Sequence, residues 1–163
     1  IYLYIYNILF VIMIFKLTRE QFLNSTIDEV WNFASSPHNL KKITPDYMDF
    51  SINSKDLAKK IYPGMIISYN VAPIFNINMT WVAEITHVVD KKFFVDEQRI
   101  GPYIMWHHEH FFETHKNGVI MRDVVTYKLP FGFIGVFMHW LFIKSKLNSI
   151  FDYRFEIIDK MFN

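Results

Sequence analysis

Hydrophobic and polar residues alternate over several stretches in the first two thirds of the chain. Alternation predicts β-strands, because successive side chains of a strand point to opposite faces. In residues 77–90 the alternate positions that include Trp81 and Ala83 are apolar and the intervening ones are mostly polar, as in an antiparallel sheet with one face in water. Strands are therefore expected over residues 15–23, 48–54, 64–73, 77–90 and 93–100.

Two short helices are expected directly after the first strand. Ser25 or Thr26 can cap the first helix. Asp28 and Glu29 fall in its first turn, where the helix dipole favours negative charge. The second helix, PHNLKKI, begins at Pro37, a residue that is favoured in the first turn.

The last segment, residues 134–162, is predicted to be one long helix. Its apolar residues recur at helical spacing: Trp140, Ile143, Leu147, Ile150, Phe151, Ile158 and Met161. Arg154 falls on the same stripe, where a structural ion pair with an acidic residue of the sheet is favoured over a contact with a ligand carboxylate.

The segment Phe131–Ile143 at the start of this helix is apolar nearly all round. Such a segment is either buried on all sides or meets an apolar partner outside the chain. A portal lid, a membrane contact and a dimer contact are the three interpretations. The portal is favoured, because only Lys144 and Lys146 lie nearby to attract anionic lipids.

The stretch KNGV (116–119) predicts a hairpin. Asn-Gly between alternating strands favours a two-residue turn of type I′ at Asn117 and Gly118. In that register Trp106 pairs with Leu129, and Phe112 pairs with Asp123. One face is then charged and polar, with His107, Glu109, Glu113, Arg122, Thr126 and Lys128. The other is mostly apolar, with Trp106, His108, His110, Phe112, Asp123, Val125, Tyr127 and Leu129.

The four histidines between His107 and His115 consequently do not act together. His108 and His110 face inward, His107 faces outward, and His115 lies near the turn. An apolar face with a few convergent polar groups is typical of a ligand pocket. The expected ligand-binding residues are Tyr69, Trp81, Trp106, His108, His110, Phe112, Asp123, Tyr127, Trp140 and Phe151.

Three interpretations of His108 and His110 remain open. A metal site would need a third ligand from Asp123, Tyr127 or Glu97, so no metal is expected. An acid–base pair would use His110 with Asp123, its diagonal neighbour across the hairpin, but no nucleophile is evident. The favoured interpretation is that both histidines are hydrogen-bonded pocket residues that orient a polar ligand head.

Composition narrows the function further. The 163 residues favour one domain. The formal charge of +1 gives no indication of a nucleic-acid partner. Aromatic residues, at 18%, exceed what a small core needs, so some are expected to line a cavity. The absence of cysteine excludes disulfides and thiolate chemistry and is compatible with a cytoplasmic location.

The apolar N-terminal stretch is expected to lie outside the domain. Residues 1–12 lack the length of a membrane span and the basic start of a signal peptide. A truncated membrane anchor is the alternative interpretation. The single domain is accordingly placed at residues 13–163.

Two paired patterns carry a resemblance to a known family. W-x-H-x-H-x-F begins at Trp106, and D-x-V-x-Y-x-L-P begins at Asp123. With them the stretches 19–45, 95–112, 119–135 and 150–156 resemble the SRPBCC superfamily, the START and Bet v 1-like helix-grip proteins. Within it the similarity is to a bacterial ligand-binding or cyclase/dehydrase-like group.

The resemblance implies an α+β helix-grip fold. Seven antiparallel strands would wrap around the long C-terminal helix, with two short helices after the first strand and a hydrophobic cavity between sheet and helix. Superfamily members bind lipids, sterols, quinones, polyketides or plant hormones, and some are enzymes. We therefore expect binding or transport of a small hydrophobic ligand without a cofactor. The alternative is a cyclase- or dehydratase-like enzyme acting on a polyketide-type substrate.

Overall fold

The computed structural model describes residues 13–73 and 77–163. The predicted N-terminal extension, residues 1–12, lies outside the described residues, and its separation from the domain stays a prediction.

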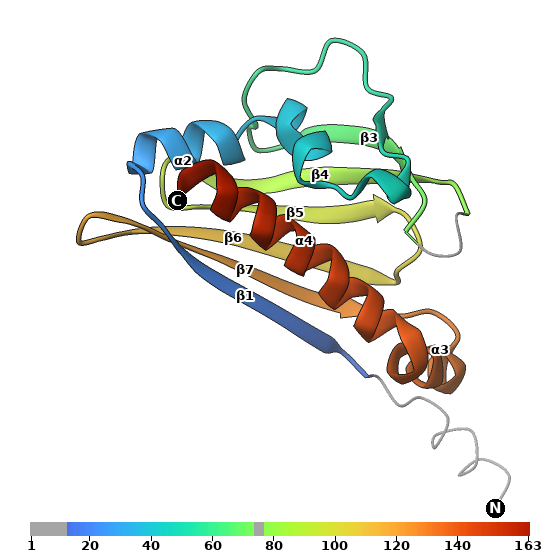
Figure 1. Cartoon of the computed structure of the whole chain (residues 1–163). Coiled ribbons are helices and arrows are strands. Elements are labelled where there is room, and N and C mark those ends of the chain that lie inside the picture. Colours follow the sequence, from blue (N-terminus) through green and yellow to red (C-terminus); the bar gives the residue numbers. More distant parts are fainter. Residues whose placement is uncertain (1–12, 74–76) are drawn as a thin grey trace, which may run out of the picture.

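The described residues form one antiparallel sheet of seven strands, in the order β1-β7-β6-β5-β4-β3-β2 (Figure 1). The strands are β1 (Phe15–Leu23), β2 (Ser51–Ile52), β3 (Met65–Val71), β4 (Met79–Val89), β5 (Phe93–Ile100), β6 (Met105–His115) and β7 (Gly118–Lys128). The first strand coincides with its predicted range, whereas the predicted strand 48–54 shortens to two residues. The helix-grip sheet expected from the sequence is thereby confirmed.

Two short helices follow β1, as predicted. Helix α2 (Ile27–Ala34) is capped by Thr26, whose hydroxyl accepts from the Glu29 amide at 3.3 Å, while the Glu29 carboxylate accepts from the Thr26 amide at 3.1 Å. This reciprocal pair satisfies two donors that the helix itself leaves free. The second, η1 (Pro37–Ile43), is a 3₁₀ helix, and a one-turn 3₁₀ helix, η2 (Asp46–Met48), precedes β2.

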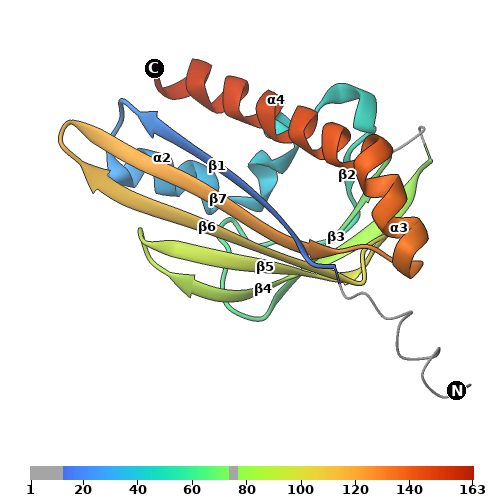
Figure 2. The ribbon, with the colours of Figure 1, turned by 90° about the horizontal axis from the view of Figure 1, so that it is seen from below.

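The C-terminal helix runs along one face of the sheet, so that the molecule has two layers (Figures 1 and 2). It consists of α3 (Gly132–Met138), a π-helical turn η3 (His139–Ile143) and α4 (Lys144–Phe162). Leu147, Ile150, Phe151 and Ile158 are buried beneath it, as the stripe predicted.

The two ends of the predicted apolar stripe are wrong. Trp140 is 62% exposed and Met161 is 44% exposed. At Trp140 the wider spacing of the π turn interrupts the i, i+3, i+4 pattern on which the prediction rested, whereas Met161 lies in the last turn of α4. His139, and not Trp140, takes the buried position at this point, with 3% of its surface exposed.

The β6–β7 hairpin turns one residue earlier than predicted. Lys116 and Asn117 form the turn, and His115 pairs with Gly118. Lys116 has a φ of 49°, and Asn117 has no positive φ, so the turn is not of type I′, which needs positive φ at both residues. A Cβ at Gly118 would collide with the carbonyl oxygen of Leu23, so this glycine serves close strand approach and not the turn.

Each residue of β6 consequently pairs with a residue of β7 two positions earlier than predicted. A shift of two positions keeps every side chain on its predicted face. Trp106 pairs with Tyr127 and His110 pairs with Asp123. The side chains of Trp106, His108, His110 and Asp123 are buried, as predicted. His107 is half-buried on the outer face and His115 is exposed.

Candidate functional site

A cavity of about 170 Å³ lies between the sheet and the C-terminal helix. Its walls are mostly apolar and come from β3 to β7, from α2 and α4, and from the 3₁₀ segments after α2. Six of the ten residues expected to contact a ligand line it: Tyr69, Trp81, Trp106, His108, His110 and Phe151. The strand face predicted to be a pocket wall therefore does border a cavity.

The other four expected residues do not line this cavity. Phe112 packs edge-on against Trp31 of α2, with ring centroids 5.4 Å apart, and does not line the cavity. Tyr127 lies beneath Phe15 and its hydroxyl is 3.2 Å from His139 Nε2. Burial raises the pKa of Tyr127 to about 12, so the hydroxyl stays protonated.

Asp123 and Trp140 are the remaining two. Asp123 lies under the imidazoles of His108 and His110, which separate it from the cavity. Trp140, in the π turn, is largely exposed. Its ring meets Phe15 edge-on, with centroids 6.5 Å apart, and Lys144 Nζ lies 4.9 Å from its centre. Asp123 consequently acts on the site only through the histidines.

The apolar part of the wall is a packed group of aromatic rings. Trp81 stacks on Tyr69 at 6.1 Å with a 13° angle between planes, and it meets Trp106 edge-on at 5.3 Å. Tyr103 also contacts both tryptophans. Burial raises the pKa of Tyr69 well above its ordinary value, with Asp96 adding to the effect. The Tyr69 hydroxyl is therefore a neutral donor in an apolar wall.

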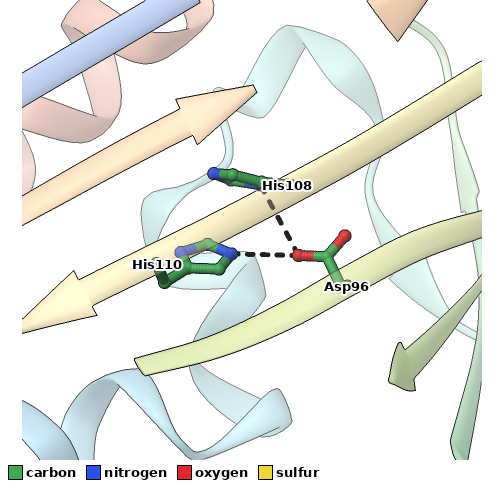
Figure 3. A group of neighbouring side chains, drawn as sticks. All are labelled: Asp96, His108 and His110. Atoms are coloured by element: carbon green, nitrogen blue, oxygen red, sulfur yellow. Dashed lines mark hydrogen bonds and ion pairs between the residues drawn. The ribbon is translucent and has the colours of Figure 1, made fainter. Parts of the chain in front are cut away.

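The polar part of the site joins three adjacent strands. Asp96 of β5 is paired with His108 of β6, and Asp123 of β7 is paired with His110 of β6. Asp96 Oδ2 lies 3.5 Å from His108 Nδ1 and 2.9 Å from His110 Nε2 (Figure 3). Asp123 Oδ1 lies 3.1 Å from His108 Nε2 and 2.7 Å from His110 Nδ1. The two carboxylates thus hold all four ring nitrogens between them.

Each of these buried groups has a shifted pKa. Burial by itself would lower the pKa of His110, but its hydrogen bonds to Asp123 and Asp96 outweigh burial and raise that pKa. Burial and the neighbouring charge of His110 lower the pKa of His108, against the pull of the carboxylates. Burial would raise the pKa values of Asp96 and Asp123, but their bonds to the histidines lower both. The carboxylates therefore stay ionised, and of the two imidazoles His110 is the one that binds a proton more readily.

Arg154 of α4 brings a positive charge to the cavity wall. The predicted ion pair with the sheet is wrong: within the described ranges 13–73 and 77–163 no carboxylate lies within 4.0 Å of its guanidinium. Its Nε is buried without a hydrogen-bond partner in that part of the chain, and the guanidinium lies 5.0 Å from the Phe151 ring centre. Its charge contributes to lowering the pKa of Asp96.

Sequence reasoning left Asp96 undecided. The run Asp96-Glu97-Gln98-Arg99 is polar at every position, so alternation does not show which pair faces inward. In the structure Asp96 faces the histidines, whereas Glu97 bonds His107 and Arg99 on the outer face. The pairing of Asp96 with His108 across β5 and β6 was the missing information, and it depends on the loop between the strands.

A second hollow of about 260 Å³ lies at the start of the C-terminal helix. Its walls are almost entirely apolar and include Pro102, Leu129 and Met138. Tyr103 borders both this hollow and the cavity. The hollow lies beside α3, in the segment Phe131–Ile143 where the sequence favoured a portal, and a passage there stays a prediction.

Comparison with solved structures identifies the fold. A protein of Chromobacterium violaceum, CV1439, superposes with a TM-score of 0.69 at 8% identity over 91% of this chain and 97% of the other. Ginseng major latex-like protein 151 from Panax ginseng gives 0.67 at 12% identity over 93% and 99%. Protein Ms6760 from Mycobacterium smegmatis gives 0.64 at 16% identity over 90% and 89%.

No protein-family model matches the chain, and neither does any curated protein sequence. The structural similarity shows that the chain has the Bet v 1-like helix-grip fold, which is the fold that the resemblance in sequence implied. Among the described residues, no helix combines the length and the hydropathy that a membrane span requires.

Proposed function

We propose that the protein binds a small, mainly apolar molecule that carries a negatively charged or strongly polar end. The observation that carries the proposal is Arg154, a cation in the wall of an apolar cavity without an ion pair among the described residues. A buried polar group without a partner is costly, so a site of this kind is stabilised by a ligand that supplies the partner.

The volume of the cavity limits the apolar part of the ligand. An apolar cavity of about 150 Å³ in another protein accepts benzene, and the cavity here is about 170 Å³. A compact ring, such as a quinone head or a polyketide-type aromatic, fits this space. A lipid chain would need the second hollow beside α3 as well, and Tyr103 would have to move aside because it borders both.

The driving force for binding is the removal of apolar surface from water, worth about 25 cal/mol per Å². The stacked rings of Tyr69 and Trp81 offer a flat aromatic surface to the ligand body. Hydrogen bonds to Arg154 and to the Tyr69 hydroxyl would then fix its polar end. In the alternative hypothesis of a cyclase- or dehydratase-like enzyme, His110 would exchange protons with substrate, but both its ring nitrogens already face carboxylates.

Two naphthalene derivatives test the proposal. Binding of 1-naphthoate and of neutral 1-naphthalenemethanol is measured by ligand-observed NMR with wild type, Arg154→Gln and Arg122→Gln. Arg122 lies on the outer face and is the matched control. We expect Arg154→Gln to weaken naphthoate at least tenfold, about 1.4 kcal/mol, and to spare the neutral compound. Equal loss of both compounds, or no binding of either to wild type, would contradict the proposal.

We further propose that the start of the C-terminal helix touches a bilayer surface. Phe131, Phe133, Phe137, Trp140 and Leu141 are each more than 60% exposed. Such a group of large apolar side chains marks an interaction site. Trp140 with Lys144 beside it is suited to the boundary between lipid headgroups and acyl chains. The contact would place the apolar hollow beside α3 next to the source of a hydrophobic ligand.

A further inference from the structure

We propose that Asp96, His108 and His110 form a binding site for a divalent first-row transition metal, such as Zn²⁺ or Fe²⁺, in the cavity wall. The facing donor atoms are Oδ2 of Asp96, Nδ1 of His108 and Nε2 of His110, and the three side chains can place one ligand atom each within 4.8 Å of the others. The proposal goes beyond ligand binding, and metal binding itself does not depend on that function.

The spacing of the donor atoms fits a metal. Metal bonds of about 2.0–2.2 Å place neighbouring donors roughly 2.9 Å apart at a right angle and roughly 3.4 Å apart at a tetrahedral angle. The separations from Asp96 Oδ2 are 2.9 Å to His110 and 3.5 Å to His108. Both separations match those that a bound metal ion imposes on neighbouring donors, and the ligand atoms of His108 and His110 lie within 4.8 Å of each other.

Asp123 provides the outer support that metal-bound histidines need. A ligating histidine almost always donates its second ring N–H to a carboxylate or carbonyl, which fixes the ring and its tautomer. Here both second nitrogens, His108 Nε2 and His110 Nδ1, face the same oxygen of Asp123 at 3.1 and 2.7 Å. When both rings are neutral and keep their protons on this side, the lone pairs of His108 Nδ1 and His110 Nε2 face Asp96. One carboxylate thus orients both imidazoles toward a common point.

Rigid strands hold this arrangement. His108 and His110 are two residues apart on β6, and their ring centroids lie 3.7 Å apart. The side chains of His108, His110 and Asp123 are less than 10% exposed, and that of Asp96 is 17% exposed. Metal binding at His110 Nε2 displaces any proton that this nitrogen shares with Asp96, so both imidazoles are neutral in the metal-bound site. Two carboxylates with two neutral imidazoles carry two negative charges, which a single divalent cation balances. Burial of this much charge is stabilised by such compensation.

The set of two histidines and one carboxylate leaves coordination positions free. The three ligands line the cavity and Asp123 does not, so the free positions would face the cavity. Zinc or iron with three protein ligands on one side is typical of sites that bind a further donor. Together with Arg154, the site would take a ligand with an anionic oxygen, such as a carboxylate, phenolate or enolate. This last step rests on the proposed function.

Metal titration of the full chain, free of affinity tags and treated with EDTA, tests the site. Zn²⁺ binding is followed by calorimetry and Co²⁺ binding by its visible absorption. We expect one ion per chain with micromolar or tighter affinity. His108→Gln and His110→Gln should each weaken binding by about 100-fold or more, and Asp123→Asn by about 10- to 100-fold. His107→Gln, on the same strand but the outer face, is the matched control and should change nothing.

Two results would overturn the proposal. Wild-type protein without a micromolar site would show that the cluster shares protons and binds no metal. Unchanged affinity in the double variant of His108 and His110 would assign the metal to histidines on the surface. If these variants unfold, ¹⁵N NMR of the wild-type imidazoles decides, because Zn²⁺ must shift His108 Nδ1 and His110 Nε2. Naphthoate titration with and without Zn²⁺ separates failure of the metal site from failure of ligand binding.

Discussion

Nδ1 of His110 lies 2.7 Å from Oδ1 of Asp123, directly across the β6–β7 hairpin. Asp123 Oδ1 also lies 3.1 Å from His108 Nε2. One buried carboxylate therefore interacts with two buried imidazoles, and its loss would leave both without their partner on β7.

Asp123→Asn is expected to destabilise the metal-free protein. The amide lacks the negative charge by which Asp123 raises the pKa of His110 and would not compensate a proton on that ring. We expect a loss of about 2–4 kcal/mol in the free energy of unfolding, measured by guanidinium denaturation with EDTA present. Glu113→Gln, on the exposed face of the same hairpin, should stay within about 0.5 kcal/mol of wild type. A loss below about 1 kcal/mol in Asp123→Asn would show that the pair is not an ion pair.

Ala83→Phe is expected to fill the cavity. Ala83 is 4% exposed and lies in the cavity wall on the same face of β4 as Trp81. The added ring occupies space that is already there, so unfolding should change by less than about 1.5 kcal/mol, below the usual cost of overpacking. Naphthoate affinity should fall at least tenfold. Val82→Phe, on the opposite face, is the control, and equal binding by both variants would place the ligand elsewhere.

Substitutions in the hairpin distinguish two roles for Gly118, as a turn residue or as a residue that allows close approach of β1. Lys116→Gly should stabilise the protein by about 0.5–1 kcal/mol, because Lys116 has a positive φ that costs a residue with a Cβ. Gly118→Ala should cost about 1–3 kcal/mol, because its Cβ would meet the Leu23 carbonyl. Thermal and chemical unfolding of both variants checks these signs. Destabilisation by Lys116→Gly would instead support the turn at Asn117 and Gly118 that the Asn-Gly pair predicted.

The strands and the inward face could be predicted because their signals are local. Alternation in β1 gave its bounds, and the register error in the hairpin preserved the face of His108 and His110 since it moved each pair by two residues. Asp96 could not be assigned, because its neighbours on β5 are all polar and only pairing with β6 orients them. Trp140 was misplaced because a π turn leaves no clear pattern in sequence.

His139 is expected to make stability depend on pH. Burial lowers its pKa, and Lys144 adds to the effect. The ring lies 3.6 Å from Phe15 between centroids, and its Nδ1 has no hydrogen-bond partner among the described residues. Protonation of His139 is therefore less favourable in the folded state than in the unfolded state. The contribution of neutral His139 to stability is complete above the unfolded pKa of about 6.5, and it is lost as pH falls toward the folded pKa.

Unfolding curves between pH 8 and pH 5 measure this effect. Compared with wild type, His139→Gln should have a flatter dependence of unfolding free energy on pH, by up to about 1.4 kcal/mol per pH unit below about 6.5. The exposed His115, changed to Gln, should give a curve parallel to wild type. Parallel curves for wild type and His139→Gln would show that His139 titrates normally in the fold.

Charged residues at the start of the C-terminal helix should abolish a bilayer contact. Phe137 and Trp140 are 63% and 62% exposed, and burying one such side chain is worth about 1.5–3 kcal/mol. Cosedimentation with phosphatidylcholine vesicles should fall at least tenfold in the Phe137→Glu, Trp140→Glu double variant. Ile66→Glu, which replaces a 50% exposed residue of β3, should bind as wild type does. The comparison is made for residues 1–163 and 13–163, because the apolar stretch 1–12 could bind vesicles by itself. Undiminished binding of the double variant in the shorter chain would rule out the proposed contact through α3 and η3.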